Sequence, residues 1–454
     1  MGTEFIKERP REVPVIRKVD VVVAGGGVAG ISAAVSSARN GAKTLLVEQG
    51  GFLGGTVTAC PMKWIGGYNP KVHAGILADM LDRMKAAHGI GREFHSPNIG
   101  GKMIEVSLDI FKEVGLAMLE EAGAEIFLHS LICDAVTENE KIGGILVENK
   151  SGRQAILAKV FIDATGDGDV AFRAGAVCEK GRPKDGKTQG MTLCGPTMDD
   201  VDGEKLWKFL CEYRRIHSKE IREWNDEHSV FAVSGFLGLI ERAKREDDFR
   251  MAYDCIWLNG KHDSNQVELS GSFISDADGT DVFDLTHAEI ESVKQISEMV
   301  AFVRKYIPGF EKSVRMDRGS AYIGVRETRR VVGGYVLTED DILQGRRFDD
   351  VIAKNSTPMD LHNPEGNQNW ILVKPYDIPY RCLVVDGIDN LLVAGRCISV
   401  THRALASVRF VPCCMATGQA AGVAASMAAK TNAVSRKINT AELQKVLKKQ
   451  GVVI

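Results

Sequence analysis

The stretch VDVVVAGGGVAGISAA, residues 19–34, decides the fold of this chain. It opens with VDVVVA, an apolar and mostly β-branched run that is typical of a parallel strand buried on both faces. Gly25, Gly27 and Gly30 follow with GxGxxG spacing, and the residues beyond them are small and suit a helix. The stretch therefore predicts a strand, a tight glycine turn and a helix.

The residues after this helix strengthen the prediction. The helix is expected to stop at Asn40-Gly41, and KTLLVE then forms a second strand that ends at Glu48. In a dinucleotide site, Gly25 makes the tight turn, Gly27 lets the pyrophosphate approach and Gly30 lets helix and strand pack closely. Glu48 stands where an acid accepts hydrogen bonds from a ribose, and the helix amino terminus faces the phosphates. We therefore interpret the stretch as a dinucleotide site rather than an ordinary glycine-rich turn.

Further glycine-rich motifs indicate which dinucleotide is bound. QGGFLGGTVTAC follows Glu48 directly, and an apolar strand runs into DATGDGDVA at residues 163–171. Near the end, NLLVAGRCIS precedes the small-residue helix CCMATGQAAGVAASMAAK, residues 413–430. FAD extends beyond its pyrophosphate and needs such additional loops, whereas a simple nicotinamide site does not. FAD is therefore the predicted cofactor.

With GVRETRR, YDIPYR and HRALASVR added, these motifs make the chain resemble the FAD-dependent oxidoreductase family from about residue 19 to about residue 430. The resemblance implies an α/β fold with a Rossmann-type, glutathione-reductase-like FAD-binding domain and no separate NAD(P)H domain. Val28 stands where the family's fingerprint usually has proline. The resemblance assigns FAD binding to Gly25, Gly27, Val28, Ala29, Gly30, Glu48, Gln49, Gly54, Gly55, Thr56, Leu131, Ile132, Ala164, Thr165, Gly166, Asp167, Gly395, Arg396, Gly418, Gln419 and Ala420. Of these, Gly418, Gln419 and Ala420 are expected at a helix amino terminus beside the pyrimidine edge of the flavin.

The spacing of the cofactor motifs predicts the domain organisation. They leave a central region of different character, so we expect an FAD-binding domain of residues 19–190 and 381–454. An inserted mixed α/β substrate domain takes residues 191–380, and residues 1–18 form an extension. Within the insertion we expect helices over 203–228 and 283–307, the second capped by Asp284 or Thr286, and strands within 247–260 and 265–274.

Composition and charge exclude several classes of function. The net charge is -3 with acids and bases interspersed, so we expect no nucleic-acid partner. The first residues lack the apolar core of a secretory signal, and no stretch suits a membrane span. The ten cysteines include no CxxC, which argues against a zinc ribbon, an iron–sulfur cluster or a local dithiol. We expect a reduced, cytoplasmic, soluble protein with no metal and no membrane partner, and leave its oligomeric state open.

The best candidates for catalysis lie in GRCISVTHRALASVRFVPCC, residues 395–414. His402 suits a general base, because its ordinary pKa is near neutral, or else a supporting role. Arg403 and Arg409 suit a clamp on a substrate carboxylate, or ion pairs with DATGDGD or with the FAD phosphates. Tyr380 either donates to a substrate oxygen or packs in the core.

Other reactive side chains are given structural roles. The four charges of GVRETRR (Arg326, Glu327, Arg329 and Arg330) are expected to form an internal ion-pair network, because they lie beside apolar residues. The neighbours Cys413 and Cys414 are expected to be buried thiols. A covalent flavin link through His73 or Cys60 is a minor alternative.

Together these features predict an FAD-dependent oxidoreductase that transfers a hydride to or from a small polar substrate, such as a carboxylic acid or sugar-like compound. We find no second GxGxxG in a strand–turn–helix setting, so electrons are expected from the substrate itself or from a transient donor. The electron acceptor or donor is left unidentified. Two alternatives stay open: a redox-neutral flavoenzyme of the isomerase or transferase type, and a flavin-bearing electron-transfer protein that acts with a partner.

Overall fold

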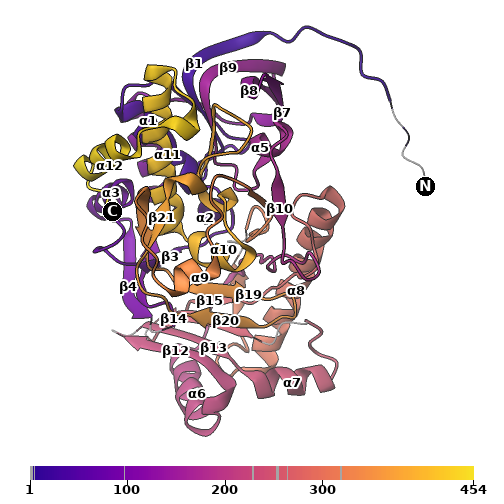
Figure 1. Ribbon diagram of the computed structural model, residues 1–454. Helices are drawn as coiled ribbons and strands as arrows, with labels where there is room; N and C mark the ends of the chain where they lie inside the picture. Colours follow the sequence, from indigo (N-terminus) through magenta and orange to yellow (C-terminus); the bar gives the residue numbers. More distant parts are fainter. Residues whose placement is uncertain are drawn as a thin grey trace.

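A seven-stranded sheet forms the centre of the larger half of the molecule (Figure 1). The computed structural model describes Glu4 and residues 6–96, 98–227, 230–251, 255–262, 264–316 and 320–454. The sheet has the order β6-β2-β1-β9-β8-β7, and β22 also pairs with β9. Pairing is parallel among β6, β2, β1, β9 and β22, whereas β8 and β7 continue the sheet in antiparallel fashion. The strands are β1 (Val15–Ala24), β2 (Thr44–Val47), β6 (Glu125–Phe127), β7 (Leu131–Glu138), β8 (Lys141–Asn149), β9 (Gly152–Asp163) and β22 (Leu391–Val393).

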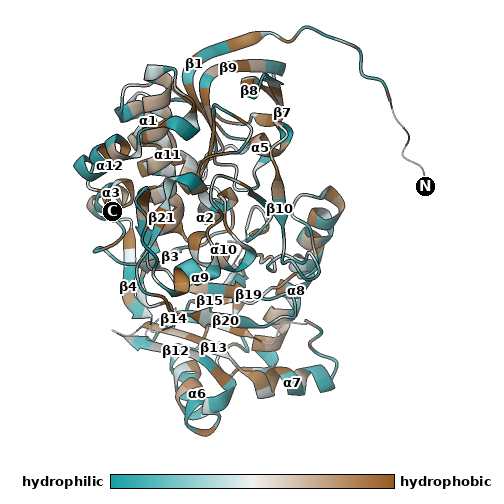
Figure 2. Cartoon of the chain, in the orientation of Figure 1, coloured by the Kyte–Doolittle hydropathy of each residue, from teal (hydrophilic) through white to brown (hydrophobic). Residues whose placement is uncertain are grey.

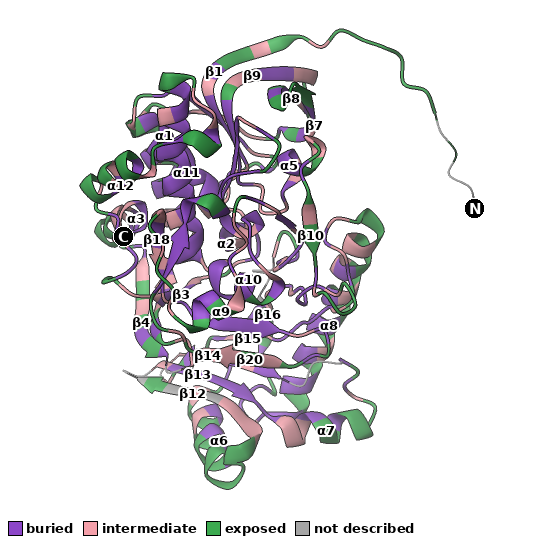
Figure 3. Ribbon diagram, in the orientation of Figure 1, coloured by how far each residue is buried: buried purple, intermediate pink, exposed green. Residues whose placement is uncertain are grey.

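Two helices distant in sequence, α1 (Val28–Arg39) and α11 (Val411–Thr431), pack side by side against this sheet. Glycine makes the close approach possible, because a Cβ on Gly418 would lie 2.2 Å from the carbonyl oxygen of Ala29. Residues on all sides of α11 are buried, as Figure 3 shows. The first helix therefore depends on the last part of the chain for its packing.

Smaller elements surround this centre. The remaining helices of the larger half are α2 (Thr56–Ala59), α3 (Ile76–Ala86), α4 (Leu108–Ala122), α5 (Asp169–Arg173), α9 (Glu339–Leu343), α10 (His402–Val408) and α12 (Thr440–Lys449). A three-stranded sheet contains β3 (Trp64–Tyr68), β5 (Gly101–Val106) and β4 (Ile90–Ser96). Three two-stranded ladders pair β10 (Cys178–Lys180) with β17 (Arg329–Val331), β18 (Val351–Asn355) with β21 (Tyr376–Pro379), and β19 (Met359–His362) with β20 (Gln368–Ile371).

The other half contains a second, antiparallel sheet with its own core. Its six strands have the order β12-β13-β14-β15-β11-β16, and its apolar core runs from Met191 to Ile323. Residues from Val331 to Ile388 contribute instead to the larger core, although 331–380 was assigned to the insertion from sequence. The elements are β11 (Thr197–Asp199), β12 (Ile221–Glu227), β13 (Val230–Gly235), β14 (Ile256–Lys261), β15 (Val267–Ser270), β16 (Val314–Met316), α6 (Gly203–Ile216), α7 (Leu237–Arg245) and α8 (Val282–Tyr306).

Two local predictions for this half are corrected. The helix expected over 203–228 ends at Ile216, and Ile221–Glu227 is the strand β12, because it pairs with β13 along an antiparallel ladder. Such tertiary pairing overrides local helix propensity. The cap of α8 is Asp281, whose carboxylate accepts from the N–H groups of Phe283 and Asp284. The expected strands are present as β14 and β15; residues 252–254 of that prediction lie outside the described part.

The described residues before β1 form an extended, largely hydrophilic and exposed segment (Figure 2). The strand begins earlier than expected, at Val15, where it already pairs with β9. In the described part of the chain, no single helix is long and apolar enough to cross a membrane, although α10 and α11, bent by 92° at their junction, pass that test jointly.

Candidate cofactor and substrate site

The predicted cofactor motifs meet at one edge of the large sheet. Ala24 at the end of β1 pairs with Val47 at the end of β2 and with Asp163 at the end of β9. Val393 at the end of β22 also pairs with Asp163. Because these strands are parallel, the four loops that follow them emerge together, which is where ligands bind in open α/β sheets.

Two glycines of the first loop are required by close backbone contacts. Gly25 has a φ of +98°, and a Cβ there would lie 2.6 Å from the carbonyl oxygen of Ala164. A Cβ on Gly30 would lie 1.8 Å from the carbonyl oxygen of Gly25. Gly27 is different, since a Cβ there would meet nothing nearer than Gly55, at 3.9 Å. Gly25 and Gly30 therefore serve the turn and the packing, whereas the space beside Gly27 has room for a Cβ at ordinary van der Waals distance.

This open space lies at the amino terminus of α1. Gly27 is the N-cap, so no side chain caps the helix, and its first turn contains no acidic residue. Val28 and Ala29 begin the helix. The first N–H groups of a helix lack partners within it and, with the helix dipole, favour an anion. The twelve-residue helix and the space beside Gly27 therefore fit the pyrophosphate of a dinucleotide.

Glu48 connects the first glycine loop to the second. Its carboxylate accepts from the N–H groups of Gly26 (2.6 Å) and Gly50 (2.7 Å), so it connects the two loops. Glu48 is also the residue that the sequence predicts to bind the ribose. Gln49 lies between these contacts. Gly54 bridges to Gly27, and Gly55 is the N-cap of α2, which begins at Thr56. The second loop therefore borders the same open space as Gly27.

The segment expected near adenine lies beside Glu48. The N–H of Ser130 donates to the Glu48 carbonyl oxygen at 2.9 Å, and the N–H of His129 donates to that of Gly50 at 3.0 Å. Leu131 and Ile132 begin β7 directly after this contact; Leu131 is exposed and Ile132 is buried.

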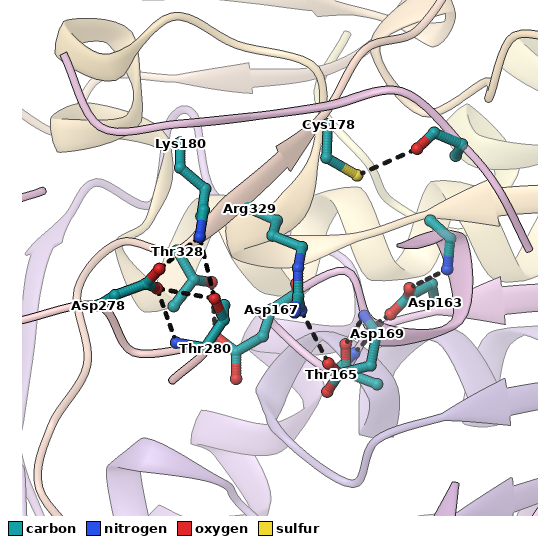
Figure 4. Close-up of polar contacts among 12 residues, drawn as sticks. Asp163, Thr165, Asp167, Asp169, Cys178, Lys180, Asp278, Thr280, Thr328 and Arg329 are labelled. Carbon is teal, nitrogen blue, oxygen red and sulfur yellow. Dashed lines mark hydrogen bonds and ion pairs between the residues drawn. The ribbon is translucent and has the colours of Figure 1, made fainter. Parts of the chain in front are cut away.

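Asp167 of the third loop lies in a charged corner (Figure 4), which the fourth loop joins through Arg396. Its carboxylate accepts from the Thr328 hydroxyl at 2.7 Å and from Arg396 at 3.0 Å. Gly166 lies against the same guanidinium, because a Cβ there would be 2.5 Å from its Nη2. Nη1 of Arg396 is buried without a partner. A buried, unpartnered guanidinium nitrogen beside a glycine turn fits an anionic ligand such as a cofactor phosphate.

Asp163, at the end of β9, holds the third loop through hydrogen bonds. It is fully buried, and it accepts from the N–H of Ala171 and from both the N–H and the hydroxyl of Thr165. Burial raises the pKa of Asp163 to about 6. Ala164 and Thr165 begin the third loop, directly after β9. Gly395 lies at the start of the fourth loop, after β22, and has a φ of +79°.

The three residues of α11 that were predicted near the flavin do not lie at the amino terminus of that helix. The helix begins at Val411, so Gly418, Gln419 and Ala420 lie about two turns inside it rather than at its amino terminus. Gly418 packs against α1, and Ala420 is fully buried. The Gln419 amide oxygen accepts from the Ile76 N–H at 2.9 Å. In this structure these three residues hold elements of the larger half together.

The four predicted catalytic residues do not converge on one point. His402 begins α10, and its Nδ1 lies 2.8 Å from a carboxylate oxygen of the buried Glu327. Arg403 is exposed and pairs with Glu339. Tyr380 is buried in a short 3-10 helix, where its hydroxyl donates to the Ser435 carbonyl oxygen at 2.7 Å. Of the two roles that the sequence left open for Tyr380, the structure shows packing.

Arg409 belongs to a buried group that sequence analysis missed, and we call this group the arginine–histidine cluster. Arg409 donates to the Asp360 carboxylate at 3.0 Å, and Nε2 of His362 lies 3.0 Å from the same carboxylate. Gln368 donates to it at 2.7 Å. The cluster comprises Arg326, Asp360, His362, Gln368 and Arg409.

Backbone contacts link this cluster to His402. The N–H of Gln189 donates to Glu327, the partner of His402, at 2.9 Å. The next residue, Gly190, donates through its N–H to the His362 carbonyl oxygen at 3.2 Å and accepts from Arg326 at 2.6 Å. The two imidazole–carboxylate pairs are therefore joined through two consecutive residues, 189 and 190.

Two buried atoms of the cluster have no hydrogen-bond partner among the residues that the structure describes. They are Nδ1 of His362 and Nε of Arg409. Burial, aided by Arg326, lowers the pKa of His362 to about 4. Burial opposes ionisation of Asp360, but His362, Arg409 and Gln368 hold the pKa of Asp360 well below its usual range. At neutral pH we therefore assign a neutral imidazole beside an ionised carboxylate.

A small cavity adjoins the cluster. Its volume is about 30 Å³, roughly that of one water molecule in the liquid. Polar and aromatic side chains surround it; the lining residues are Thr192, Trp257, Ser270, Gly271, Ser272, Phe273, Arg326 and His362. The arrangement can hold one small polar group between a guanidinium and an imidazole.

The minor alternatives for reactive side chains are also placed. Nδ1 of His73 accepts from the Asn69 N–H at 3.1 Å and its Nε2 lies 3.0 Å from the Asn355 amide oxygen, so both ring nitrogens are engaged. Cys413 and Cys414 are buried free thiols. Arg329 pairs with Asp169 and Arg330 with Glu327, so part of GVRETRR is an internal ion-pair network. No group of three metal-ligating side chains occurs among the residues that the structure describes.

Parallel strand ends, a glycine turn, an uncapped helix amino terminus and a second glycine loop define a dinucleotide-binding enzyme of the Rossmann-like flavoprotein class. The chain belongs to the FAD dependent oxidoreductase family, whose family model matches residues 20–447. FAD is therefore the cofactor of this chain.

Curated relatives match a smaller part of the chain. The thiamine thiazole synthase of Aeropyrum pernix is 30% identical over 173 residues, which are 34% of this chain and 57% of that protein. The thiamine thiazole synthase of Methanococcus vannielii is 30% identical over 164 residues, 33% of this chain and 56% of that protein. The chain thus spans little more than half the length of these relatives.

A solved structure covers more of the chain at lower identity. The geranylgeranyl bacteriochlorophyll reductase-like protein from Thermoplasma acidophilum is 16% identical, with a TM-score of 0.49 over 96% of this chain and 84% of its own.

Proposed function

We propose that this FAD-dependent oxidoreductase carries out a two-electron oxidation or reduction of a small organic acid, and that the arginine–histidine cluster binds the acid. The supporting observation is that His362 and Arg409, which share the Asp360 carboxylate, each have a buried polar atom with no partner in the described part of the chain. Buried polar atoms are nearly always hydrogen-bonded in proteins, so a group of unpartnered ones points to a ligand.

The chemistry of these atoms indicates the kind of ligand. The guanidinium of Arg409 and that of Arg326 are suited to a carboxylate, which guanidinium groups bind in a planar, paired geometry. A sugar-like compound without an acid offers no carboxylate for this pairing.

His362 is the proposed proton-transfer group. Its Nε2–H can donate to Asp360, which leaves the Nδ1 lone pair available, and its lowered pKa keeps the ring neutral at physiological pH. Asp360 orients the ring and stabilises the positive charge that forms when Nδ1 takes a proton. FAD, when bound, supplies the hydride acceptor or donor. His402, held by Glu327, is the second imidazole to be compared with it.

The test is anaerobic reduction of the flavin by candidate substrates. FAD-loaded protein is mixed without oxygen with small carboxylic acids and with matching alcohols or sugars that lack the acid, and the visible flavin absorbance is followed. We expect bleaching by one or more acids. Replacing His362 with Asn should slow the bleaching by about 100-fold or more, because a general base contributes about 10²–10⁴-fold.

Matched variants separate the roles. Arg409→Lys should raise the substrate concentration needed for half-maximal bleaching, whereas Arg242→Lys on the exposed face of α7 should leave it unchanged. His287→Asn on α8 is the control for histidine replacement. If flavin bleaching is slowed in His402→Asn but not in His362→Asn, His402 and not His362 is the general base. Bleaching by neutral sugars alone would contradict the proposed substrate class, and turnover without bleaching would favour a redox-neutral reaction.

A further inference from the structure

Cys60 and Cys194 meet although they are 134 residues apart, with a separation of 3.3 Å between their sulfur atoms. Cys60 is almost fully buried and Cys194 is half-buried. The Cys194 thiol also lies 3.5 Å from the Cys60 carbonyl oxygen. Closing a disulfide bond would require the two sulfur atoms to approach by about 1.3 Å, because the bond is about 2.05 Å long.

The pair lies between the cofactor loop and the second half of the molecule. Cys60 follows α2, and its N–H donates to the Thr56 carbonyl oxygen at 3.0 Å, one helical turn from the glycine loop that borders the cofactor space. On the other side, the Ala321 N–H donates to the Ala59 carbonyl oxygen at 2.7 Å. Gly324 leaves room for the sulfur, because a Cβ there would lie 3.0 Å from the Cys60 Sγ.

The surroundings distinguish the two thiols. The Ser320 hydroxyl, which accepts from the Cys194 N–H at 3.1 Å, lies 3.4 Å from the Cys60 sulfur and can donate to it. The hydrogen bond from Cys194, together with Ser320 and the charge of Arg326, lowers the pKa of Cys60 to about 6. The same contact with Cys60, and burial, raise the pKa of Cys194. Cys60 is thus the thiol that loses its proton more readily, the asymmetry that thiol–disulfide chemistry uses.

From the sulfur–sulfur contact and its position beside the cofactor loop, we infer that Cys60 and Cys194 are a redox pair that exchanges two electrons with bound FAD. When the disulfide forms, the S–H bond of Cys194 breaks, an S–S bond to the Cys60 thiolate forms, and one proton and two electrons leave. Oxidised FAD takes up the two electrons and the proton, so the reaction is balanced. This inference rests on the cofactor and is independent of the substrate proposed above.

An anaerobic reductive titration tests the inference by counting electrons. FAD-loaded protein is first oxidised with a small disulfide, freed of it, and titrated with dithionite while the flavin spectrum is recorded. The wild-type protein should take up four electrons per FAD, two by the flavin and two by the disulfide. Cys60→Ser and Cys194→Ser should each take up two, and Cys211→Ser, which removes an exposed thiol on α6, should still take up four.

A second measurement needs no variant. The oxidised and the reduced wild-type protein are alkylated after unfolding, and the peptides are analysed by mass spectrometry. We expect a peptide pair linked through Cys60 and Cys194 in the oxidised sample alone. Uptake of two electrons by the wild-type protein with both cysteines alkylated would overturn the inference, whether or not any acid bleaches the flavin. If the Cys60–Cys194 disulfide forms but its reduction leaves the flavin spectrum unchanged, the disulfide does not exchange electrons with FAD, and the inference is overturned.

Discussion

Replacing Gly27 with alanine separates cofactor binding from folding, because the position borders open space. Gly27 has a φ of -69°, which alanine adopts readily, and its Cβ would meet no atom nearer than 3.9 Å. Reduced freedom of the unfolded chain stabilises such a variant by about 0.4–1 kcal/mol. Alanine is less favourable than glycine at an N-cap, which offsets part of this gain. The free energy of unfolding of the FAD-free protein should therefore change by less than about 1 kcal/mol.

The same methyl group should weaken FAD binding. It occupies the space beside the first N–H groups of α1, where the pyrophosphate is expected. Loss of one hydrogen bond to a charged group costs about 1.5–3 kcal/mol, or about 10–150-fold in the dissociation constant. Quenching of FAD fluorescence measures the affinity, and urea unfolding of the FAD-free protein measures the stability.

Gly30→Ala is the matched comparison. Its Cβ would lie 1.8 Å from the Gly25 carbonyl oxygen, so the turn must open by about 1.2 Å to reach a separation of 3.0 Å, below which Cβ contacts are essentially never found. Overpacking of this kind costs about 1–3 kcal/mol of stability, so this variant should lose stability as well as FAD affinity. Wild-type FAD affinity in Gly27→Ala would refute the placement of the phosphates. A loss of stability equal to that of Gly30→Ala would refute the steric reasoning.

Three further predictions concern single residues. Burial raises the pKa of Asp163 from 3.8 to about 6, so its contribution to stability is complete only below the unfolded pKa and is lost as the pH rises through 6. Urea unfolding should show the stability of the wild type relative to Asp163→Asn falling by about 2 kcal/mol between pH 4 and pH 7, and a flat difference would contradict this. Tyr380→Phe should lower the melting temperature and leave bleaching of the flavin by substrate unchanged, because the buried Ser435 carbonyl loses a donor worth about 1–3 kcal/mol. Slower bleaching at an unchanged melting temperature would instead indicate that the Tyr380 hydroxyl contacts the substrate. Arg396→Met should weaken FAD binding, measured by fluorescence, and reduce its dependence on salt, whereas an unchanged salt dependence would exclude a phosphate contact.

The parts of the fold that could be predicted from sequence are those in which neighbouring residues decide the outcome. The strand, turn and helix around Gly25–Gly30 follow from contacts within a few residues, and their end at Arg39 agrees with the expected stop. β12 was missed because its partner strand, and not its own sequence, fixes its conformation. The α8 cap was missed by a few residues, since several acidic side chains there suit the role.

The candidate substrate site was harder to predict, because its members come from distant segments. Gly190 and Arg326 approach His362 through tertiary contacts that no local motif encodes. One signal was available: Asp360 and His362 are two residues apart on the strand β19, which places both side chains on the same face. Cys60 and Cys194 have no such signal, because a CxxC search sees only neighbours in sequence.

The pairing of α1 with α11 has a consequence for synthesis of the protein. Between Arg39, at the end of α1, and Thr431, at the end of α11, a ribosome needs about 20–80 s at rates of about 5–20 residues per second. During that time the glycine turn lacks the helix that packs against it, while the second core, which ends at Ile323, is already complete in sequence. The half of the protein whose synthesis begins first is therefore the half whose core can be completed only when the chain is nearly finished.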